Sequence, residues 1–206
     1  MTEAERVFVV DDDLALRMSI SRSLTVRGYK VSHFGSAAEF LAECGDGRPG
    51  CLILDYGMPG MNGLELQAHL NSIGNQIPII FITGHAGIPE SVQATKAGAV
   101  DFLEKPYRLE VLVERIESAL ELDRQRRRAV DARKSAEEAL SSLTPREKEI
   151  HDFICLRPDL SSSKAIAREL DISPRTVDLH RARILEKMGC ASVVELIAKN
   201  RQMTSA

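Results

Sequence analysis

The chain alternates five times between short apolar runs and stretches with helical spacing, and this alternation restricts the fold more than any other feature. The apolar runs lie at residues 7–10, 30–34, 51–54, 78–82 and 100–103. Between them, segments such as 16–28 and 91–99 show the spacing of amphipathic helices. Strands that take turns with helices form parallel sheets covered on both faces. The front half is therefore predicted to be a five-stranded, doubly wound α/β domain.

Side chains with functional groups follow four of these runs, where each predicted strand ends. Asp11 and Asp12 follow the first run, Asp55 the third and Thr83 the fourth, and Lys105 comes shortly after the fifth. In a doubly wound sheet, ligands bind beyond the carboxyl ends of the strands. We therefore expect these side chains to converge on one edge of the sheet.

Three converging carboxylates need a positive partner, because burying like charges without one is costly. Mg²⁺ suits such a site, since it prefers oxygen ligands and often binds through one or two carboxylates plus a phosphate. Lys105 would add positive charge and Thr83 a hydrogen-bond donor, and together they could hold a phosphoryl group. Each Asp alone has a plainer interpretation as a helix N-cap. Asp13 fits that interpretation, and Asp11 is compatible with it.

The motifs VVDDD, LDYGMPGMNGLEL, ITGH and KAGAVDFLEKP resemble those of the receiver domain of bacterial two-component response regulators, over residues 5–122. The resemblance implies that Asp55 is the phosphoryl acceptor. It implies that Asp11 and Asp12 form the acidic pair at the Mg²⁺ ion, with the backbone carbonyl of Gly57 as a further contact. The position of Gly57 has no side chain that could shield or orient a hydrolytic water, which leaves the lifetime of the phosphoryl group open.

Four further features are implied by the same resemblance. Thr83 and Lys105 would contact the phosphoryl oxygens, Phe102 would be an aromatic switch residue, and the Lys105–Pro106 bond would be cis. Asp55 would attack a phosphohistidine of a partner kinase in line. Thr83 would then move inward and Phe102 would follow, which biases a two-state element formed by the fourth helix and the fifth strand. A plain core aromatic is the alternative for Phe102.

The charge is distributed unevenly along the chain and indicates where the domains divide. Lys and Arg against Asp and Glu number 10 against 17 over residues 1–122, 6 against 4 over 123–142, and 11 against 9 over 143–206. The middle segment has no Gly or Pro and few large apolar residues, as in a solvated helix. We predict a receiver domain at 1–122, a helical linker at 123–140 and an output domain at 141–206.

The helix that leads into the linker carries an apolar stripe only near its start. Leu109, Leu112, Ile116 and Leu120 form this stripe, and the apolar seam nearly ends beyond Asp123. We favour a helix that docks on the receiver and continues as a solvated spacer over a full coiled coil.

The back half contains the signals of a helix-turn-helix. Thr144, with Pro next and Glu147 three residues on, forms a capping box that opens a helix. Farther on, one helix at 165–170 and a short turn at 171–172 precede a second helix, capped by Ser173. The output domain is therefore predicted to be all-α.

The second of these helices has two faces. Val177, Ile184 and Met188 recur at helical spacing and should face the core. Such a helix can enter the DNA major groove, although a solvated amphipathic helix is the alternative. The opposite face holds Arg175, Leu179, Ala182 and Arg183, with Arg181 and Lys187 beside it.

The order TPREKEI, then IARELDISPRTVDLHRARILEKMG, resembles the LuxR-type output domain of the NarL/FixJ subfamily over residues 141–200. The resemblance implies that Asp178, Leu179 and Ala182 face the bases, whereas Thr176, Arg181 and Lys187 serve mainly the DNA backbone. Asp178 could accept a hydrogen bond from cytosine N4 or merely repel phosphate. The loop RPDLSSSK is longer than in the family and lacks its Gly and Asn-Lys, so the first helices could sit differently.

Together these features predict a phosphorylation-activated transcription regulator. We expect a sensor histidine kinase and promoter DNA as partners, RNA polymerase as a possible one, and a homodimer once Asp55 is modified. No enzymatic activity is expected beyond the receiver's own phosphoryl transfer and dephosphorylation. The chain has no apolar run long enough to span a membrane, and MTEAER lacks a hydrophobic signal region, so we expect a cytoplasmic protein.

Two other classes of function remain open from the sequence. The acidic pocket could belong to a Mg²⁺-dependent phosphohydrolase, although no separate general acid is evident. The back half could bind a partner protein instead of DNA, because its excess of basic residues is only two (11 against 9). The four cysteines show no CxxC pairing and are interpreted as ordinary reduced thiols.

Overall fold

The computed structural model describes residues 5–44, 47–84 and 98–204 of the chain. These residues form two compact units that divide between Arg127 and Arg128. The first unit contains β1 (Arg6–Val10), α1 (Leu14–Val26), β2 (Val31–Phe34), α2 (Ala37–Cys44), β3 (Gly50–Asp55), α3 (Gly63–Ser72), β4 (Ile79–Thr83), β5 (Asp101–Glu104) and the start of α5 (Leu109–Ser141). The second contains the end of α5, then α6 (Pro145–Leu156), η1 (Pro158–Leu160), α7 (Ser163–Glu169), α8 (Pro174–Met188) and α9 (Val193–Thr204).

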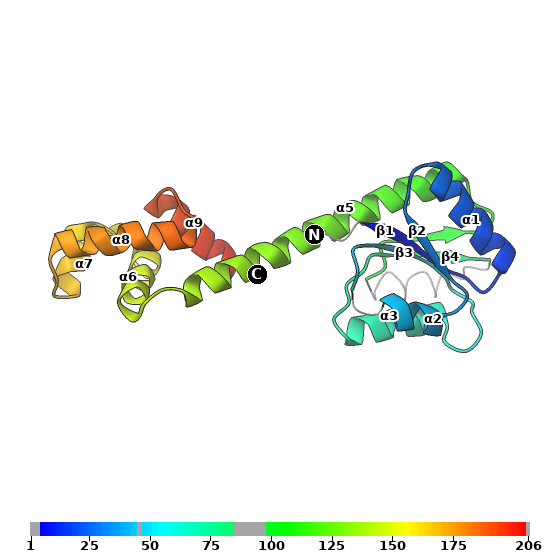
Figure 1. Cartoon of the computed structure of the whole chain (residues 1–206), viewed down its shortest axis with the longest axis horizontal. Helices are drawn as coiled ribbons and strands as arrows, with labels where there is room; N and C mark the ends of the chain where they lie inside the picture. The colour runs from blue at the N-terminus through cyan, green and yellow to red at the C-terminus, as the bar shows by residue number, and fades with distance from the viewer. Residues whose placement is uncertain (1–4, 45–46, 85–97, 205–206) are drawn as a thin grey trace. The chain divides into compact units, whose positions relative to one another are not determined.

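The five strands form one parallel sheet in the order β2-β1-β3-β4-β5 (Figure 1). This confirms the predicted five-stranded α/β fold. The strand order reverses between β1 and β3, so the switch point lies between Asp11 and Asp55, which follow and end these strands. The predicted fourth helix, at 91–99, falls largely on residues outside the described part of the chain.

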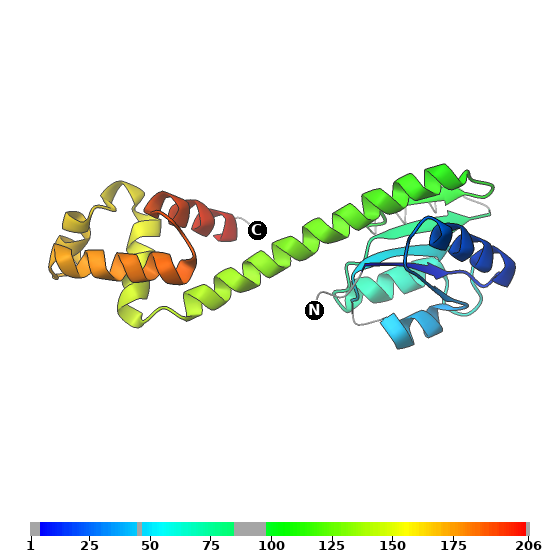
Figure 2. The same cartoon turned by 45° about the horizontal axis from the view of Figure 1, so that its top comes forward.

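Alternate residues of each strand face opposite layers of helices. Phe8 and Leu52 pack with α2 and α3, whereas Val7 and Ile53 pack with α1 and α5. Figure 2 shows these two pairs of helices on opposite faces of the sheet. Because side chains alternate along a strand, a run that is apolar at every position is buried on both sides. This double burial leaves the carboxyl edge as the place where polar groups gather.

Local capping signals set the starts of the helices. Asp13 caps α1, accepting hydrogen bonds from the N–H groups of Ala15 and Leu16, so its interpretation as a cap is confirmed.

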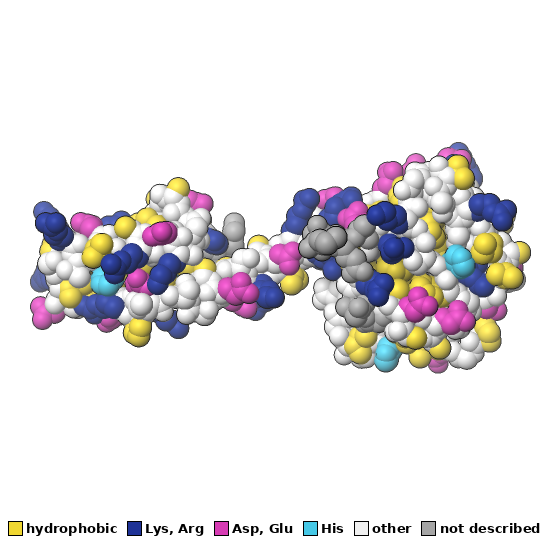
Figure 3. All heavy atoms as spheres, viewed as in Figure 1, with side chains coloured by type: hydrophobic (Ala, Val, Ile, Leu, Met, Phe, Trp, Pro, Cys, Tyr) yellow, Lys and Arg dark blue, Asp and Glu magenta, His cyan; other side chains and the backbone are white. Residues whose placement is uncertain are grey.

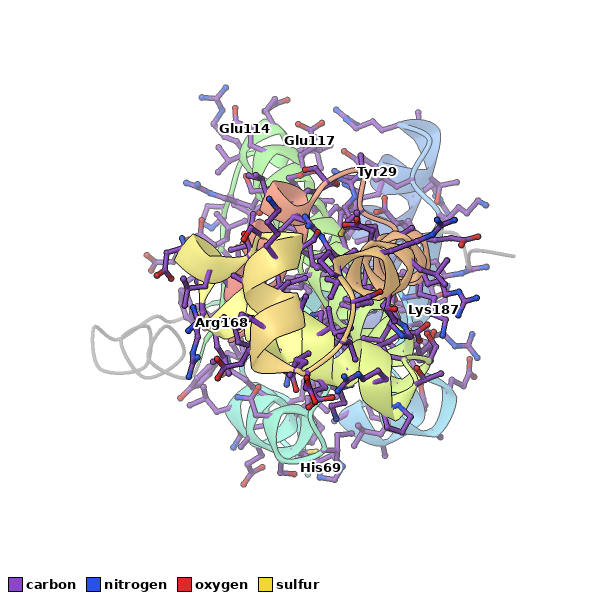
Figure 4. All side chains as sticks on the ribbon, turned by 90° about the vertical axis from the view of Figure 1, so that its left-hand side faces the viewer. Tyr29, His69, Glu114, Glu117, Arg168 and Lys187 are labelled. Atoms are coloured by element: carbon purple, nitrogen blue, oxygen red, sulfur yellow. The ribbon has the colours of Figure 1, made fainter. Side chains whose placement is uncertain are left out.

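Beyond the C-terminal end of α1, the Tyr29 hydroxyl donates to Glu117 on α5 at 3.4 Å; both residues are labelled in Figure 4. The segment that follows α1 is therefore joined to α5 by a polar contact, in addition to the apolar core that the two helices share.

Helix α5 extends the first unit beyond the boundary drawn from sequence. Leu112, Ile116 and Leu120 of the predicted stripe are buried. Asp123, which the sequence analysis assigned to the linker, is also buried; it accepts a hydrogen bond from Gly50 N at 2.9 Å and pairs with Arg127 Nε at 2.8 Å. Residues 128–135 are exposed.

The second unit is all-helical, as predicted, with a core that draws on α6, α7, α8 and α9. Thr144 and Glu147 form the expected capping box of α6. The first helix of the helix-turn-helix begins two residues earlier than predicted, because Ser162 caps it. Ser173 caps α8, and Gly189 ends it in the left-handed conformation, with φ of 62°. Within the described residues, no helix is long and apolar enough to cross a membrane.

Candidate functional site

Two buried carboxylates meet one ammonium group at the carboxyl edge of the sheet. Lys105 Nζ lies 2.7 Å from Asp55 Oδ1 and 3.2 Å from Asp11 Oδ2. The second oxygen of each carboxylate accepts a backbone N–H: Gly57 N donates to Asp55 at 2.8 Å, and Asp13 N donates to Asp11 at 2.8 Å. Both acidic side chains are thus oriented at both oxygens.

Asp12 stands apart from this pair. It is exposed, whereas Asp11 is 3% and Asp55 7% exposed. In the described part of the chain, no three His, Cys, Asp or Glu side chains lie close enough together to hold a metal ion. Of the three carboxylates expected to converge, Asp11 and Asp55 therefore contact Lys105 directly, and the place of Asp12 at the site stays a prediction.

Burial and charge act against each other on the ionisable groups of this site. Burial raises the pKa of Asp11, more than the N–H of Asp13 and the charge of Lys105 lower it. Burial by itself lowers the pKa of Lys105, but the hydrogen bond to Asp55 and the charges of both carboxylates outweigh it, and the net change is upward. Lys105 therefore stays charged at neutral pH.

Thr83 and Phe102 lie on the neighbouring strands. Thr83 ends β4 and is 4% exposed, and its carbonyl accepts the N–H of Lys105 at 2.8 Å. Phe102 is half-buried on β5, and its ring lies 6.0 Å from that of Phe81. The Lys105–Pro106 bond is cis, as the resemblance implied. This strand order brings Thr83 and Lys105 to the same edge as Asp55.

An open cavity of about 690 Å³ borders Lys105, the residue that contacts the two carboxylates. Lys105 and Tyr107 line it on one side, and Leu16 and Ile20 of α1 line it on the other. The cavity therefore has a partly apolar wall beside Lys105.

In the second unit, α8 presents an exposed face with basic residues. Val177, Ile184 and Met188 are buried in the core, as predicted. Leu179 is 52% exposed. Figure 3 shows Lys and Arg side chains gathered over the α7 and α8 part of the unit. Of the residues expected to contact DNA, Arg175, Asp178, Leu179, Ala182, Arg183 and Lys187 are exposed, and Thr176 and Arg181 are half-buried.

Lys187 makes contacts inside the protein that were not predicted from the sequence. Its Nζ lies 2.7 Å from Glu147 Oε2 and donates to the carbonyl of Ser142 at 2.9 Å; Lys187 is labelled in Figure 4. Glu147 is 2% exposed and also accepts the N–H of Thr144. The hydrogen bond from Lys187 and that from Thr144 lower the pKa of Glu147 to about 2. Lys187 thus joins α8 to the start of α6.

A second internal network involves two of the expected DNA contacts. Ser163, the first residue of α7, donates its hydroxyl hydrogen to Asp178, and Arg181 Nη1 donates to the Ser163 oxygen at 2.8 Å. Neither the contact of Ser163 with α8 nor that of Glu147 was predicted from the sequence. Glu147 was recognised only as part of a cap, and no local pattern distinguishes Ser163 from the serines beside it.

Comparison with protein families assigns both units. Residues 7–117 match the response regulator receiver domain, and residues 141–199 match the bacterial regulatory proteins of the luxR family. The response regulator protein TodT of Pseudomonas putida is 42% identical over 94% of this chain and 84% of its own length. The transcriptional regulatory protein FixJ of Rhizobium meliloti is 40% identical over 93% of this chain and 92% of its own length.

Solved structures agree with this assignment. The response regulator StyR superposes with a TM-score of 0.86 at 39% identity, covering 97% of this chain and all of its own. Full-length FixJ from B. japonicum gives 0.60 at 35% identity and covers both chains completely. The chain therefore belongs to the two-component response regulators of the NarL/FixJ subfamily, transcription factors in which a receiver domain precedes a LuxR-type helix-turn-helix output domain.

Proposed function

We propose that Asp55 accepts a phosphoryl group from a sensor histidine kinase, and that this modification promotes promoter binding through α7 and α8. Receiver domains imply a kinase partner, and LuxR-type domains imply DNA binding. The observation that carries the proposal is the 2.7 Å contact between Lys105 Nζ and Asp55 Oδ1, at a buried carboxylate on the switch-point edge. Because the family consists of transcription factors and not of catalytic enzymes, the phosphohydrolase alternative has no support.

The chain's own groups suit transfer to Asp55. A carboxylate oxygen of Asp55 would form a bond to phosphorus while the bond from phosphorus to the kinase histidine nitrogen breaks, and the imidazole leaves with the bonding electron pair. The ammonium of Lys105 already contacts Asp55, so it would also stabilise the negative charge on the oxygens of the phosphoryl group as that group is transferred. The hydroxyl of Thr83 would donate to another oxygen. Gly57 N holds the carboxylate in one orientation throughout.

The donor set fits Mg²⁺, which the receiver family generally uses for phosphotransfer. Asp11 and Asp55 carry one more negative charge than Lys105 neutralises, and all the candidate ligands are oxygens. Asp11, Asp55 and the carbonyl of Gly57 would hold the ion, and the exposed Asp12 would contact it through one of the water molecules that Mg²⁺ retains. When bound, Mg²⁺ would offset the negative charge of the phosphoryl oxygens.

The response to modification would run through Thr83 and Phe102. Thr83 would move toward the acyl phosphate, and Phe102, which is half-buried beside Phe81, would turn into the space behind it. The helix that completes this switch falls on residues outside the described part of the chain. We infer that the modified receiver forms a homodimer, which would match two half-sites about one helical turn apart.

For the output domain, we propose that α8 enters the major groove of promoter DNA. Its exposed residues Asp178, Leu179 and Ala182 would reach base edges, and its arginines with Thr176 would contact phosphates. The ammonium of Lys187 is bound to Glu147. We therefore propose that Lys187 mainly positions α8 and contributes less to contacts with the DNA backbone. RNA polymerase is a further proposed partner, and the cytoplasm the proposed location.

The test of this function uses the full chain with acetyl phosphate and Mg²⁺. The unaltered protein should gain the mass of one phosphoryl group, shift to a dimer in light scattering, and bind its promoter more tightly. Asp55→Asn should do none of these, because an amide is a poor nucleophile. Asp13→Asn is the matched control: it keeps a good N-cap on α1 and should label normally.

Intact-protein mass spectrometry before and after donor treatment checks the site. Unchanged labelling of Asp55→Asn would exclude Asp55 as the acceptor. Labelling without any gain in DNA affinity would separate the chemistry from the proposed regulation.

A further inference from the structure

The first residue of α7 connects two side chains of the DNA-facing helix. Ser163 Oγ donates to Asp178 Oδ1 and accepts from Arg181 Nη1 at 2.8 Å. Asp178 and Arg181 are one turn apart on α8, and a hydroxyl can donate one hydrogen and accept others at once. The three residues therefore form a chain of hydrogen bonds across the helix-turn-helix.

These hydrogen bonds can run in only one direction, from Arg181 through Ser163 to Asp178. Arg181 cannot accept a hydrogen bond and an ionised Asp178 cannot donate one, so the Ser163 hydrogen must point to the carboxylate. The hydroxyl is not needed to cap α7, because the neighbouring Ser162 already accepts the N–H of Ala165 at 3.2 Å. Ser163 is half-buried between the two helices, whereas Asp178 is exposed. The contact therefore orders an exposed acidic side chain from the protein side.

An acidic residue on a DNA-facing helix is repelled by the DNA phosphates and weakens binding unless its charge is offset and its orientation is fixed. Free to rotate, a carboxylate would lie near phosphates of its own sign. Held at Oδ1, it keeps its other oxygen as an acceptor, and cytosine N4 is the donor that a carboxylate reads in the major groove. The guanidinium of Arg181, one hydrogen bond away, offsets part of the negative charge.

We propose that Ser163 is a specificity-determining positioning residue: by fixing Asp178, it sets the preference for a cytosine at one position of each half-site. The inference rests on the proposed binding of DNA by α8. It assigns to Ser163 an effect on which sequence is bound rather than on how tightly DNA is bound in general.

The experiment is selection of bound sequences from a random double-stranded DNA library, with the full chain, acetyl phosphate and Mg²⁺ at one salt concentration. Ser163→Ala and Asp178→Ala should lose the preference at the same base pair. Discrimination there, measured on duplexes that differ in that pair, should fall roughly 2- to 10-fold for Ser163→Ala, the effect of leaving one side chain to be ordered on binding. Ser163→Thr keeps the hydroxyl and should keep the preference.

Two measurements isolate the mechanism. The double variant of Ser163→Ala and Asp178→Ala should lose no more discrimination than Asp178→Ala alone, because Ser163 acts through Asp178. Thermal melting of each variant should match the unaltered protein, so that a fold defect is not mistaken for lost specificity.

The outcomes are distinct. A Ser163→Ala protein that keeps the full base preference, or that weakens all sequences equally, overturns the role of Ser163. An unaltered protein that selects no sequence at all overturns the proposed DNA binding together with this inference.

Discussion

At the scale of single residues, two lysines with similar surroundings in sequence have different tasks. Lys105 contacts two carboxylates at the edge of the sheet and stays partly exposed, with 25% of its side chain accessible. Lys187 contacts one buried carboxylate, Glu147, and a backbone carbonyl. The first arrangement leaves negative charge for a ligand to neutralise, whereas the second neutralises its partner. The two sites should therefore respond differently to ions and to substitution.

Arg181 should contribute to phosphate binding in a way that salt reveals. Its guanidinium uses one N–H on Ser163 and has others for a DNA phosphate. We expect Arg181→Ala to reduce the slope of log affinity against log salt concentration by about 0.9, the effect of one lost phosphate contact. Lys148→Ala, at an exposed site on α6, should leave the slope unchanged. Fluorescence anisotropy over a series of salt concentrations measures both, and equal slopes for Arg181→Ala and the unaltered protein would remove Arg181 from the phosphate contacts.

At the scale of elements, the start of β3 is a point where only glycine fits. Gly50 has φ of 147°, and a Cβ there would lie 1.9 Å from the carbonyl oxygen of Arg6 on β1. The N–H of Gly50 donates to Asp123, and Arg127 joins the same carboxylate while donating to the carbonyl of Gly47. One glycine thus lets β1 pair closely with β3 and lets α5 dock on the end of that pair.

Gly50→Ala should strongly destabilise the receiver unit. The new methyl group must displace backbone atoms of β1 and sits on an unfavourable dihedral angle, so we expect a loss of about 2 to 4 kcal/mol in the free energy of unfolding. Gly35→Ala is the control, because its Cβ would meet Arg17 and Glu39 at an ordinary 3.5 Å. Urea unfolding followed by circular dichroism compares the two, and similar losses for both variants would contradict the steric argument.

At the scale of the whole molecule, the two units have separate hydrophobic cores, so each should respond to its own conditions. The receiver depends on a buried sheet and on the hydrogen bonds that Asp123 and Arg127 of α5 make with Gly50 and Gly47. The output unit contains an ionised, buried Glu147 whose pKa lies well below its ordinary 4.5. At acidic pH, the output unit should therefore unfold in a thermal transition separate from that of the receiver.

The sign of this effect follows from the lowered pKa. Glu147 stabilises the folded unit as a carboxylate, so its contribution is complete above pH 4.5 and is lost as the pH falls toward 2. We expect the melting temperature of the output transition to fall over that range. In Glu147→Gln it should start lower at neutral pH and change less on acidification. Calorimetry of both proteins at a series of pH values measures this, and parallel curves would exclude Glu147 as the cause.

The sequence by itself determined the features that depend on neighbours along the chain. The period of the apolar runs specified the sheet, and Asp13, Thr144 and Ser173 marked the helix starts, because capping uses backbone groups two or three residues away. The resemblance of the motifs then named the family and the residues at the sheet edge. All of this rests on local spacing.

Only the tertiary structure decided which charged groups meet. It paired Lys105 with Asp11, 94 residues away, left Asp12 exposed, and placed Lys187 on Glu147, 40 residues away. It also made Ser163 a link between Asp178 and Arg181. Such contacts depend on how helices and strands pack, and a side chain's distance from a partner on another element changes with that packing while the local sequence pattern stays the same.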